Sequence, residues 1–209
     1  MTEAETRALL VELAASLFAR GYSVGSAGNI SARVDDGGYV MTPTNSSLGR
    51  LDPARLSKLD AEFCHTGGDR PSKEVFMHRA MYEARPEAGA VVHLHSTYAT
   101  AVSCLAEPGE TAPIPVLTPY FAMRAGRTLP VVPYIRPGDP AMGAAIREAA
   151  AGARAVLLAN HGPVVSAGTL VDAVYAAEEI EEAARLALLL RGANPRVLTA
   201  AQVEELAGR

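Results

Sequence analysis

Three histidines stand where strands are expected to end. His93 and His95 lie in the apolar run Ala90–Ser96, and residues i and i+2 of a strand face the same side. His161 follows a second apolar run, Ala155–Ala159. Three neutral imidazoles beside an open position are the ligand set of a catalytic zinc ion, and imidazole also suits other divalent metals. This spacing favours a metal site over three unrelated structural histidines.

A glutamate at an expected helix start is the acidic partner of that site. Ser72–Arg85 is predicted to be a helix, and Glu74 lies in its first turn, where the helix dipole stabilises a carboxylate. Near a zinc ion, such a carboxylate can be a fourth ligand or a proton carrier. By itself, a glutamate in a first helical turn is an ordinary feature. His78, one turn later on the same face, is expected to support the site or the core.

Three small polar groups could bind an anion. Glycine-rich turns and helix starts present backbone N–H groups, and a lysine adds a point charge. Each group can equally be a plain turn or helix cap. Their members are Gly28, Asn29, Thr44, Asn45, Ser72 and Lys73. Tyr120, beside a proline, is either a half-buried packing residue or a proton donor.

The composition limits the class of protein. A chain of 209 residues fits one domain, 1–209, and its net charge of −4 argues against nucleic-acid binding. We expect no membrane span and no secretory segment, because no apolar run is long enough. Cys64 and Cys104 show no metal or disulfide spacing, which suits reduced thiols in a cytoplasmic protein.

Lysines are rare, and this bears on mechanism. Only Lys58 and Lys73 are lysines among the 19 basic residues. Schiff-base chemistry on a carbonyl requires a lysine, whereas the histidines offer a metal electrophile. Lys58 is expected on a surface helix, and Lys73 adjoins one of the polar groups.

Helices and strands are predicted to alternate, with several strands arriving as hairpins. This pattern favours an α/β fold with helices on both faces of a mixed sheet. The acidic run Glu178–Glu182 is expected on a solvated helix face without a role in the site. Helices are predicted at Thr2–Gly21, after Asp52, at Ser72–Arg85 and Thr97–Leu105, after Asp139, at Thr169–Arg191 and after Thr199; strands are predicted at Ile30–Val34, Tyr39–Thr42, Ala90–His95, Val131–Tyr134 and Ala155–Ala159.

Five ordered segments resemble the class II aldolase and adducin-head family. They are Gly28–Ser31, Thr42–Thr44, Pro71–Glu74, His93–Ser96 and Asn160–Gly162. The resemblance covers about residues 5 to 205. It implies a three-layer α/β/α sandwich around a central mixed, largely antiparallel sheet. It also implies a homotetramer with active sites at subunit interfaces.

The resemblance assigns a role to each matching residue. It makes the three histidines ligands of one Zn²⁺ or other divalent ion per subunit, and it makes Glu74 the acid–base glutamate. Tyr120 resembles a proton-donating tyrosine that a neighbouring subunit contributes. The phosphate-binding positions of the family correspond to Gly28, Asn29, Thr44 and Ser72.

Two residues depart from the sugar-phosphate aldolases of the family. Asn45 stands where the fuculose-phosphate enzyme has a glycine, and Lys73 replaces a small residue. Lys73 could orient a substrate carboxylate or hold a phosphate. The longer strings Gly25–Asn29, Leu51–Lys58, Met123–Gly126, Tyr134–Asp139 and Leu158–Val165 resemble one group of this family, the 3-oxo-tetronate 4-phosphate decarboxylases.

This likeness implies a carboxy-lyase that acts on a small phosphorylated sugar acid. Loss of carbon dioxide from a β-keto acid leaves an electron pair, and zinc on the keto oxygen would hold it as an enediolate. The products would be dihydroxyacetone phosphate and carbon dioxide. A class II sugar-phosphate aldolase or epimerase stays open as an alternative, because aldol cleavage passes through the same enediolate. A non-catalytic module like the adducin head is less favoured, since such a module has no reason to keep a zinc site.

Overall fold

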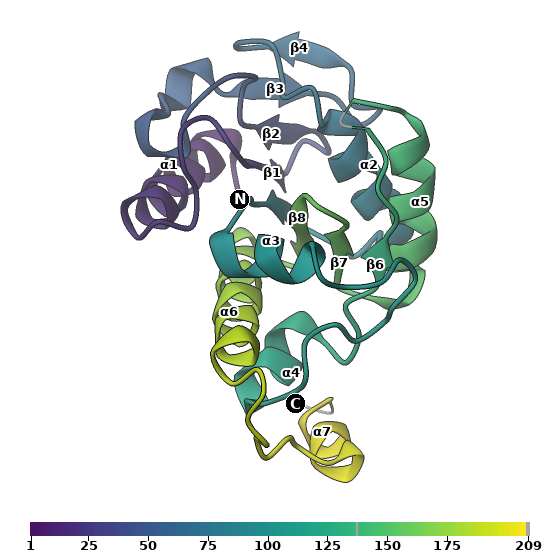
Figure 1. The fold of residues 1–209 in the computed structure, drawn as a ribbon. Coiled ribbons are helices and arrows are strands. Elements are labelled where there is room, and N and C mark those ends of the chain that lie inside the picture. Colours follow the sequence, from purple (N-terminus) through teal and green to yellow (C-terminus); the bar gives the residue numbers. More distant parts are fainter. Residues whose placement is uncertain (137, 208–209) are drawn as a thin grey trace.

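A computed structural model describes residues 1–136 and 138–207. Its central feature is an eight-stranded sheet with the order β4-β3-β2-β1-β5-β8-β7-β6, covered by helices on both faces (Figure 1). All neighbouring strands in the described ranges pair antiparallel except β6 and β7, which are parallel. The predicted three-layer sandwich around a mixed, largely antiparallel sheet is confirmed. Pro137 of the string Tyr134–Asp139, and residues 208–209 of the expected domain, lie outside the described residues.

Strands and helices alternate along the chain. The strands are β1 (Asn29–Arg33), β2 (Tyr39–Met41), β3 (Ser57–Leu59), β4 (His65–Gly67), β5 (Ala90–His93), β6 (Val131–Val132), β7 (Ala155–Leu158) and β8 (Gly162–Ala167). The α-helices are α1 (Glu3–Ala19), α2 (Val75–Ala84), α3 (Thr97–Ser103), α4 (Pro119–Ala125), α5 (Ala141–Ala149), α6 (Leu170–Leu189) and α7 (Ala200–Ala207). Short 3₁₀ turns cover Leu48–Arg50, Pro53–Arg55 and Ala150–Gly152.

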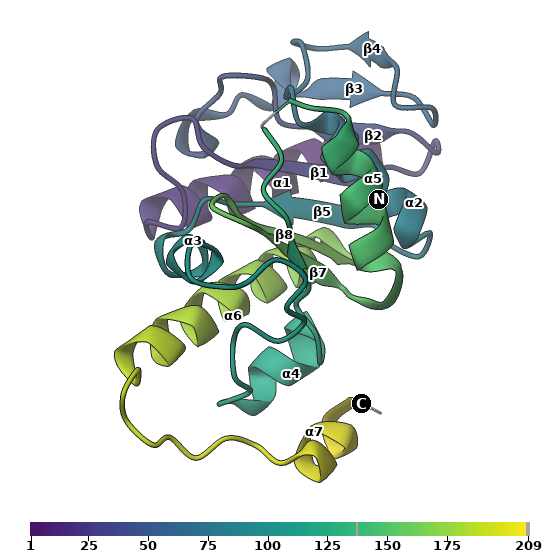
Figure 2. The ribbon, with the colours of Figure 1, turned by 45° about the vertical axis from the view of Figure 1, so that its right-hand side comes forward.

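The sheet separates two apolar layers. Helices α2 and α5 lie together on one face, while α1, α3, α4 and α6 pack toward the other (Figures 1 and 2). Side chains of a strand point alternately to its two faces. Val91 therefore packs in the layer of α2 and α5, and Val92 packs in the layer of α6. Burying a valine stabilises the fold by about 1.5–3 kcal/mol, so both layers hold the central strands in place.

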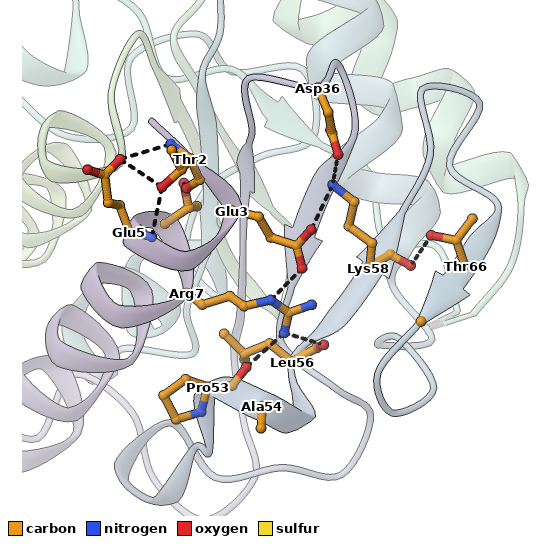
Figure 3. A network of polar contacts seen from close by, with 12 residues as sticks. Thr2, Glu3, Glu5, Arg7, Asp36, Pro53, Ala54, Leu56, Lys58 and Thr66 are labelled. Carbon is orange, nitrogen blue, oxygen red and sulfur yellow. Dashed lines mark hydrogen bonds and ion pairs between the residues drawn. The ribbon is translucent and has the colours of Figure 1, made fainter.

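The prediction of a surface helix around Lys58 is wrong. Lys58 lies on β3, and its ammonium nitrogen is 2.6 Å from an Asp36 carboxylate oxygen and 3.4 Å from one of Glu3 (Figure 3). The two residues beside it, Ser57 and Leu59, are buried, as expected of a strand with alternating faces. The spacing of Leu56 and Leu59 fits a helix as well as a strand, and the pairing of this segment with β2 makes it a strand.

One helix begins later than expected, and another was not expected at all. Helix α2 begins at Val75, so Glu74 is its N-cap residue rather than a first-turn residue. Helix α4 was not predicted, because its first residue, Pro119, signalled only a turn. Proline suits the first position of a helix, and the Thr118 hydroxyl accepts a hydrogen bond from the Phe121 backbone N–H at 3.4 Å.

None of the helices in the described ranges is both long enough and apolar enough to cross a membrane. Cys64 and Cys104 are free and exposed, as the absence of a disulfide spacing predicted.

Candidate metal centre at one edge of the sheet

Strand pairing brings the candidate residues to one edge of the sheet. His93 is the last residue of β5, and it pairs with Asn29, the first residue of the antiparallel strand β1. On its other side, β5 pairs with β8. The turn between β7 and β8 contains His161, so this histidine reaches the same edge. The strand ends at His93, and His95 lies just beyond it.

The three histidines and Glu74 form one compact cluster. One ligand atom from each of these four residues lies within 4.8 Å of all the others. The Nε2 atom of His95 is 3.0 Å from that of His93 and 3.1 Å from that of His161. The Glu74 carboxylate oxygens are 3.6 Å and 3.5 Å from the Nε2 atoms of His93 and His161. The four residues predicted to form the metal site therefore converge in space.

A backbone contact sets the tautomer of His93. Its Nδ1 donates a hydrogen bond to the carbonyl oxygen of Pro163 at 2.9 Å. A carbonyl can only accept, so the proton is on Nδ1 and the Nε2 lone pair faces the cluster. A carbonyl behind the ring is the usual support of a metal-binding histidine.

The electrostatics of the cluster favour neutral imidazoles. Burial lowers the pKa of His93 well below its usual value, and the neighbouring histidines lower it further. Burial, followed by the nearby His161, lowers the pKa of His95 to about 4. Burial also lowers the pKa of His161, against the opposing effect of Glu74. Neutral imidazoles and one carboxylate are suitable ligands for a divalent cation, so the residues present fit a metal.

Asn29 connects this cluster to the protein interior. Its amide nitrogen donates to Glu74 Oε2 at 2.7 Å, and its amide oxygen faces His78 Nε2 at 2.5 Å. The hydroxyl of Ser72 accepts a hydrogen bond from the Glu74 backbone N–H at 3.2 Å, which fixes the start of α2. His78 is fully buried behind Asn29, and its expected role in supporting the site or the core stays a prediction.

The segments that carry the predicted phosphate residues converge. Ile30 and Thr42 exchange hydrogen bonds at 3.1 Å and 2.9 Å, which joins the start of β1 to the end of β2. Pro43 and Pro71 form an isolated antiparallel bridge. Three polar groups that are distant in sequence therefore lie on adjoining segments. Thr44 and Asn45 line a surface hollow together with Arg50, a cation that the sequence analysis did not select.

Two glycines allow close approach of the backbone near the cluster. Gly28 has φ +79°, and a Cβ atom there would lie 2.9 Å from the His93 carbonyl oxygen. Gly162 has φ +137°, and a Cβ atom there would lie 2.4 Å from the Leu94 carbonyl oxygen. Larger residues cannot fit without moving the turns that carry the histidines.

Tyr120 does not join the cluster within one chain. It lies in the first turn of α4 and is 60% exposed. Among the residues that the structure describes, no hydrogen bond or ion pair connects it to the four clustered residues. Its role as a donor from a neighbouring subunit stays a prediction.

The expectation of a solvated Glu178–Glu182 face is wrong for one member. Glu181 of α6 is 6% exposed, and its carboxylate accepts hydrogen bonds from the backbone N–H groups of Tyr98 at 2.8 Å and Ala99 at 2.7 Å. It therefore caps α3, the helix that follows His95. A sequence signal existed, because position 181 has helical spacing to the apolar Ala177 and Ala184.

Comparison with known proteins identifies the family. The family model described as Class II Aldolase and Adducin N-terminal domain matches residues 8–188, and the chain belongs to this family. The resemblance inferred from the five motifs is confirmed.

Several relatives are similar over most of their length. The chain is 48% identical over 209 residues to the 3-oxo-tetronate 4-phosphate decarboxylase of Haemophilus influenzae, covering 100% of this chain and 99% of that protein. It is 34% identical over 168 residues to the L-fuculose phosphate aldolase of Escherichia coli strain CFT073, covering 80% of this chain and 75% of that protein. The crystal structure of YgbL from Klebsiella pneumoniae matches with a TM-score of 0.94 and 48% identity over 99% of each chain.

Proposed function

We propose that this chain is a metal-dependent carboxy-lyase. Its substrate would be a 3-oxo-tetronate 4-phosphate, and its products dihydroxyacetone phosphate and carbon dioxide. One observation carries the proposal. The chain is 48% identical over its whole length to a 3-oxo-tetronate 4-phosphate decarboxylase, and its fold brings one ligand atom from each of four residues within 4.8 Å of all the others. These residues are His93, His95, His161 and Glu74.

The three histidines would hold one Zn²⁺ per subunit. Their neutral state supports this assignment, as does the carbonyl behind His93. When bound, the ion supplies a Lewis acid that stabilises the electron pair left by carbon dioxide. Glu74 lies close enough to two of the histidines to complete the ligand set in the resting protein.

Glu74 is our candidate for the proton donor. In the reaction the bond between C1 and C2 breaks, carbon dioxide leaves, and C2 must gain one proton. A carboxylate that has first taken up a proton from water can deliver it to C2 if it lies beside the reacting carbon. The hydrogen bond from Asn29 holds the Glu74 side chain at the edge of the cluster. The alternative donor is Tyr120, which would have to come from a neighbouring subunit.

The polar segments beside the cluster would anchor the phosphate. Ser72 keeps its hydroxyl hydrogen free to donate, because its oxygen accepts from the Glu74 N–H. Binding energy from this non-reacting end of the substrate can be used at the reacting carbon. Lys73 is exposed beside the same helix start and would pair with the phosphate or the carboxylate of the substrate. The full proposed set is Gly28, Asn29, Thr44, Asn45, Ser72 and Lys73.

The working form would be a cytoplasmic homotetramer with active sites at subunit interfaces. Two features support an interface near α4. Tyr120 is 60% exposed and Met123 is 36% exposed on this helix, although both are large side chains. Paired subunits would cover them, and one subunit would then supply Tyr120 to the site of another.

A product assay tests the proposed function. Purified enzyme is incubated with 3-oxo-tetronate 4-phosphate, and carbon dioxide, dihydroxyacetone phosphate and free aldehydes are measured together. We expect carbon dioxide and dihydroxyacetone phosphate in equal amounts. Aldehyde release from sugar phosphates, without carbon dioxide from the keto acid, would favour the aldolase alternative. Glu74→Gln is the matched variant, because it keeps the shape of the side chain and removes its acid.

A further inference from the structure

A continuous chain of buried polar side chains runs from the interior to Glu74. Tyr82 lies 3.1 Å from the Ser31 hydroxyl, which lies 2.7 Å from His78 Nδ1. His78 Nε2 lies 2.5 Å from the Asn29 amide oxygen, and the Asn29 amide nitrogen lies 2.7 Å from Glu74 Oε2. The four residues that lead to Glu74 come from β1 and α2, and all four are buried: Tyr82, Ser31, His78 and Asn29. Such a chain is costly to bury unless every member is paired.

The carboxylate at its end gives the chain one direction. A carboxylate accepts hydrogen bonds, so Asn29 must turn its NH₂ group toward Glu74 and its oxygen toward His78. That oxygen can only accept, and therefore Nε2 of His78 carries the proton. The Nδ1 atom of the neutral ring is then an acceptor, and it receives the hydrogen of the Ser31 hydroxyl.

We propose that His78 is a positioning residue whose Nε2–H locks the Asn29 amide with its NH₂ group toward Glu74. The proposal rests on the acid–base function proposed for Glu74. His78 itself is 0% exposed and sits behind Asn29, so it acts through that amide and does not touch the substrate.

The burial of His78 suits this role. Burial lowers the pKa of His78 to about 3, so the ring stays neutral at physiological pH and keeps a single N–H. If the Asn29 amide rotated by half a turn, its oxygen would face the Glu74 carboxylate and its NH₂ group would face the Nε2–H. Both contacts would be repulsive. A neutral His78 protonated on Nε2 therefore adds a second barrier to the rotation, beside that of the Glu74 carboxylate, and an apolar side chain would remove this second barrier.

The test compares side chains that replace different ring nitrogens. The amide nitrogen of glutamine can occupy the place of Nε2, whereas that of asparagine reaches only the place of Nδ1. We expect His78→Gln to keep most of the wild-type kcat. We expect His78→Asn and His78→Leu to lower kcat by about 10- to 100-fold, as is usual for residues that orient a ligand or catalytic group, with little change in KM. His65→Gln is the matched control, because this histidine is exposed on β4.

Thermal unfolding and a second variant separate positioning from packing. If His78 were only a packing residue, kcat would follow the melting temperature, and His78→Leu would be at least as active as His78→Gln. Ser31→Ala leaves the ring in place but removes the donor to Nδ1. We expect it to lower kcat less than His78→Asn, because Nε2 can still carry the proton.

Nuclear magnetic resonance of the ¹⁵N-labelled, zinc-loaded protein tests the tautomer without an activity measurement. We expect the His78 ring to be protonated on Nε2 only. A proton on Nδ1, or equal kcat values for His78→Gln and His78→Asn, would overturn the proposal. If the wild-type protein released no carbon dioxide, the proposed function would fail, but the tautomer measurement would still decide whether His78 orients Asn29.

Discussion

The Nδ1 atom of His93 donates to the carbonyl oxygen of Pro163 at 2.9 Å, and Pro163 lies in β8. The strand beside β5 therefore fixes the ring of the most buried histidine of the cluster. Because the carbonyl belongs to the sheet backbone, no side-chain substitution at position 163 removes it. The orientation of this ligand is set by the fold itself.

We expect metal binding to depend on all three histidines. His95→Ala should lose most of its bound metal and most of its activity, because the Nε2 atom of His95 lies within 3.1 Å of those of His93 and His161. Elemental analysis after dialysis measures the metal content, and His65→Ala is the control with an exposed histidine. Full metal content in a variant lacking all three ligands would refute the assignment.

The free energy of unfolding should decrease as the pH is lowered through the titration range of His78. Burial lowers its folded pKa to about 3, whereas the unfolded chain has the ordinary value of about 6.5. The unfolded state therefore binds more protons below pH 6.5, and stability decreases from there toward pH 3. Urea unfolding from pH 7.5 to 4.5 measures this decrease. His78→Gln should flatten the slope, and an unchanged slope would contradict the buried neutral state.

Borohydride should not trap the substrate on the enzyme. Schiff-base chemistry needs a free lysine amine. The amine of Lys58, on β3, lies 2.6 Å from an Asp36 carboxylate oxygen. Lys73 directly precedes Glu74 in the chain and is exposed, and we propose that it binds an anionic group of the substrate. Mass spectrometry after borohydride treatment with substrate should show the unmodified chain. An adduct at Lys73 would disprove the metal mechanism.

Ser72 and Thr44 should contribute to binding of the substrate phosphate and not to the chemical step. Removing one hydrogen bond to a charged group costs about 1.5–3 kcal/mol, or roughly 10- to 100-fold in kcat/KM. Ser72→Ala and Thr44→Ala should lower kcat/KM for the phosphorylated substrate by this factor and hardly affect its dephosphorylated analogue. Asn29→Ala should impair both substrates, because Asn29 also holds Glu74. Equal losses for both substrates in Ser72→Ala would remove this residue from the phosphate site.

Gly162→Ala should loosen the His161 turn. The added methyl group would lie 2.4 Å from the Leu94 carbonyl oxygen at a φ of +137°. Strain of this kind costs about 1–3 kcal/mol of folding stability. Gly168→Ala, where an added Cβ atom meets nothing within 4 Å, is the control on the neighbouring segment. The melting temperature and the metal affinity should both decrease in Gly162→Ala and stay unchanged in Gly168→Ala.

The sequence predicted the histidine cluster because histidine is rare in this chain and His93 and His95 have the two-residue spacing of one strand face. It also predicted the α/β architecture, since caps and apolar runs are local signals. It did not predict the strand around Lys58 or the helix that begins at Pro119, because pairing with β2 and packing against α6 decide those segments. The carboxylate of Glu181 was assigned to solvent for the same reason. Its partners, Tyr98 and Ala99, are about eighty residues away in sequence.

Helix α3 supports two of the three histidines. His95 lies just before it, the Thr100 hydroxyl donates to the His161 carbonyl at 3.4 Å, and the Asn160 N–H donates to the Ser103 carbonyl at 3.2 Å. Glu181 holds the first turn of this helix from α6. A local opening of α3 would therefore release two ligands in one event. We therefore expect the release of a bound metal to be coupled to the opening of this seven-residue helix, in addition to the breaking of the bonds to the ion.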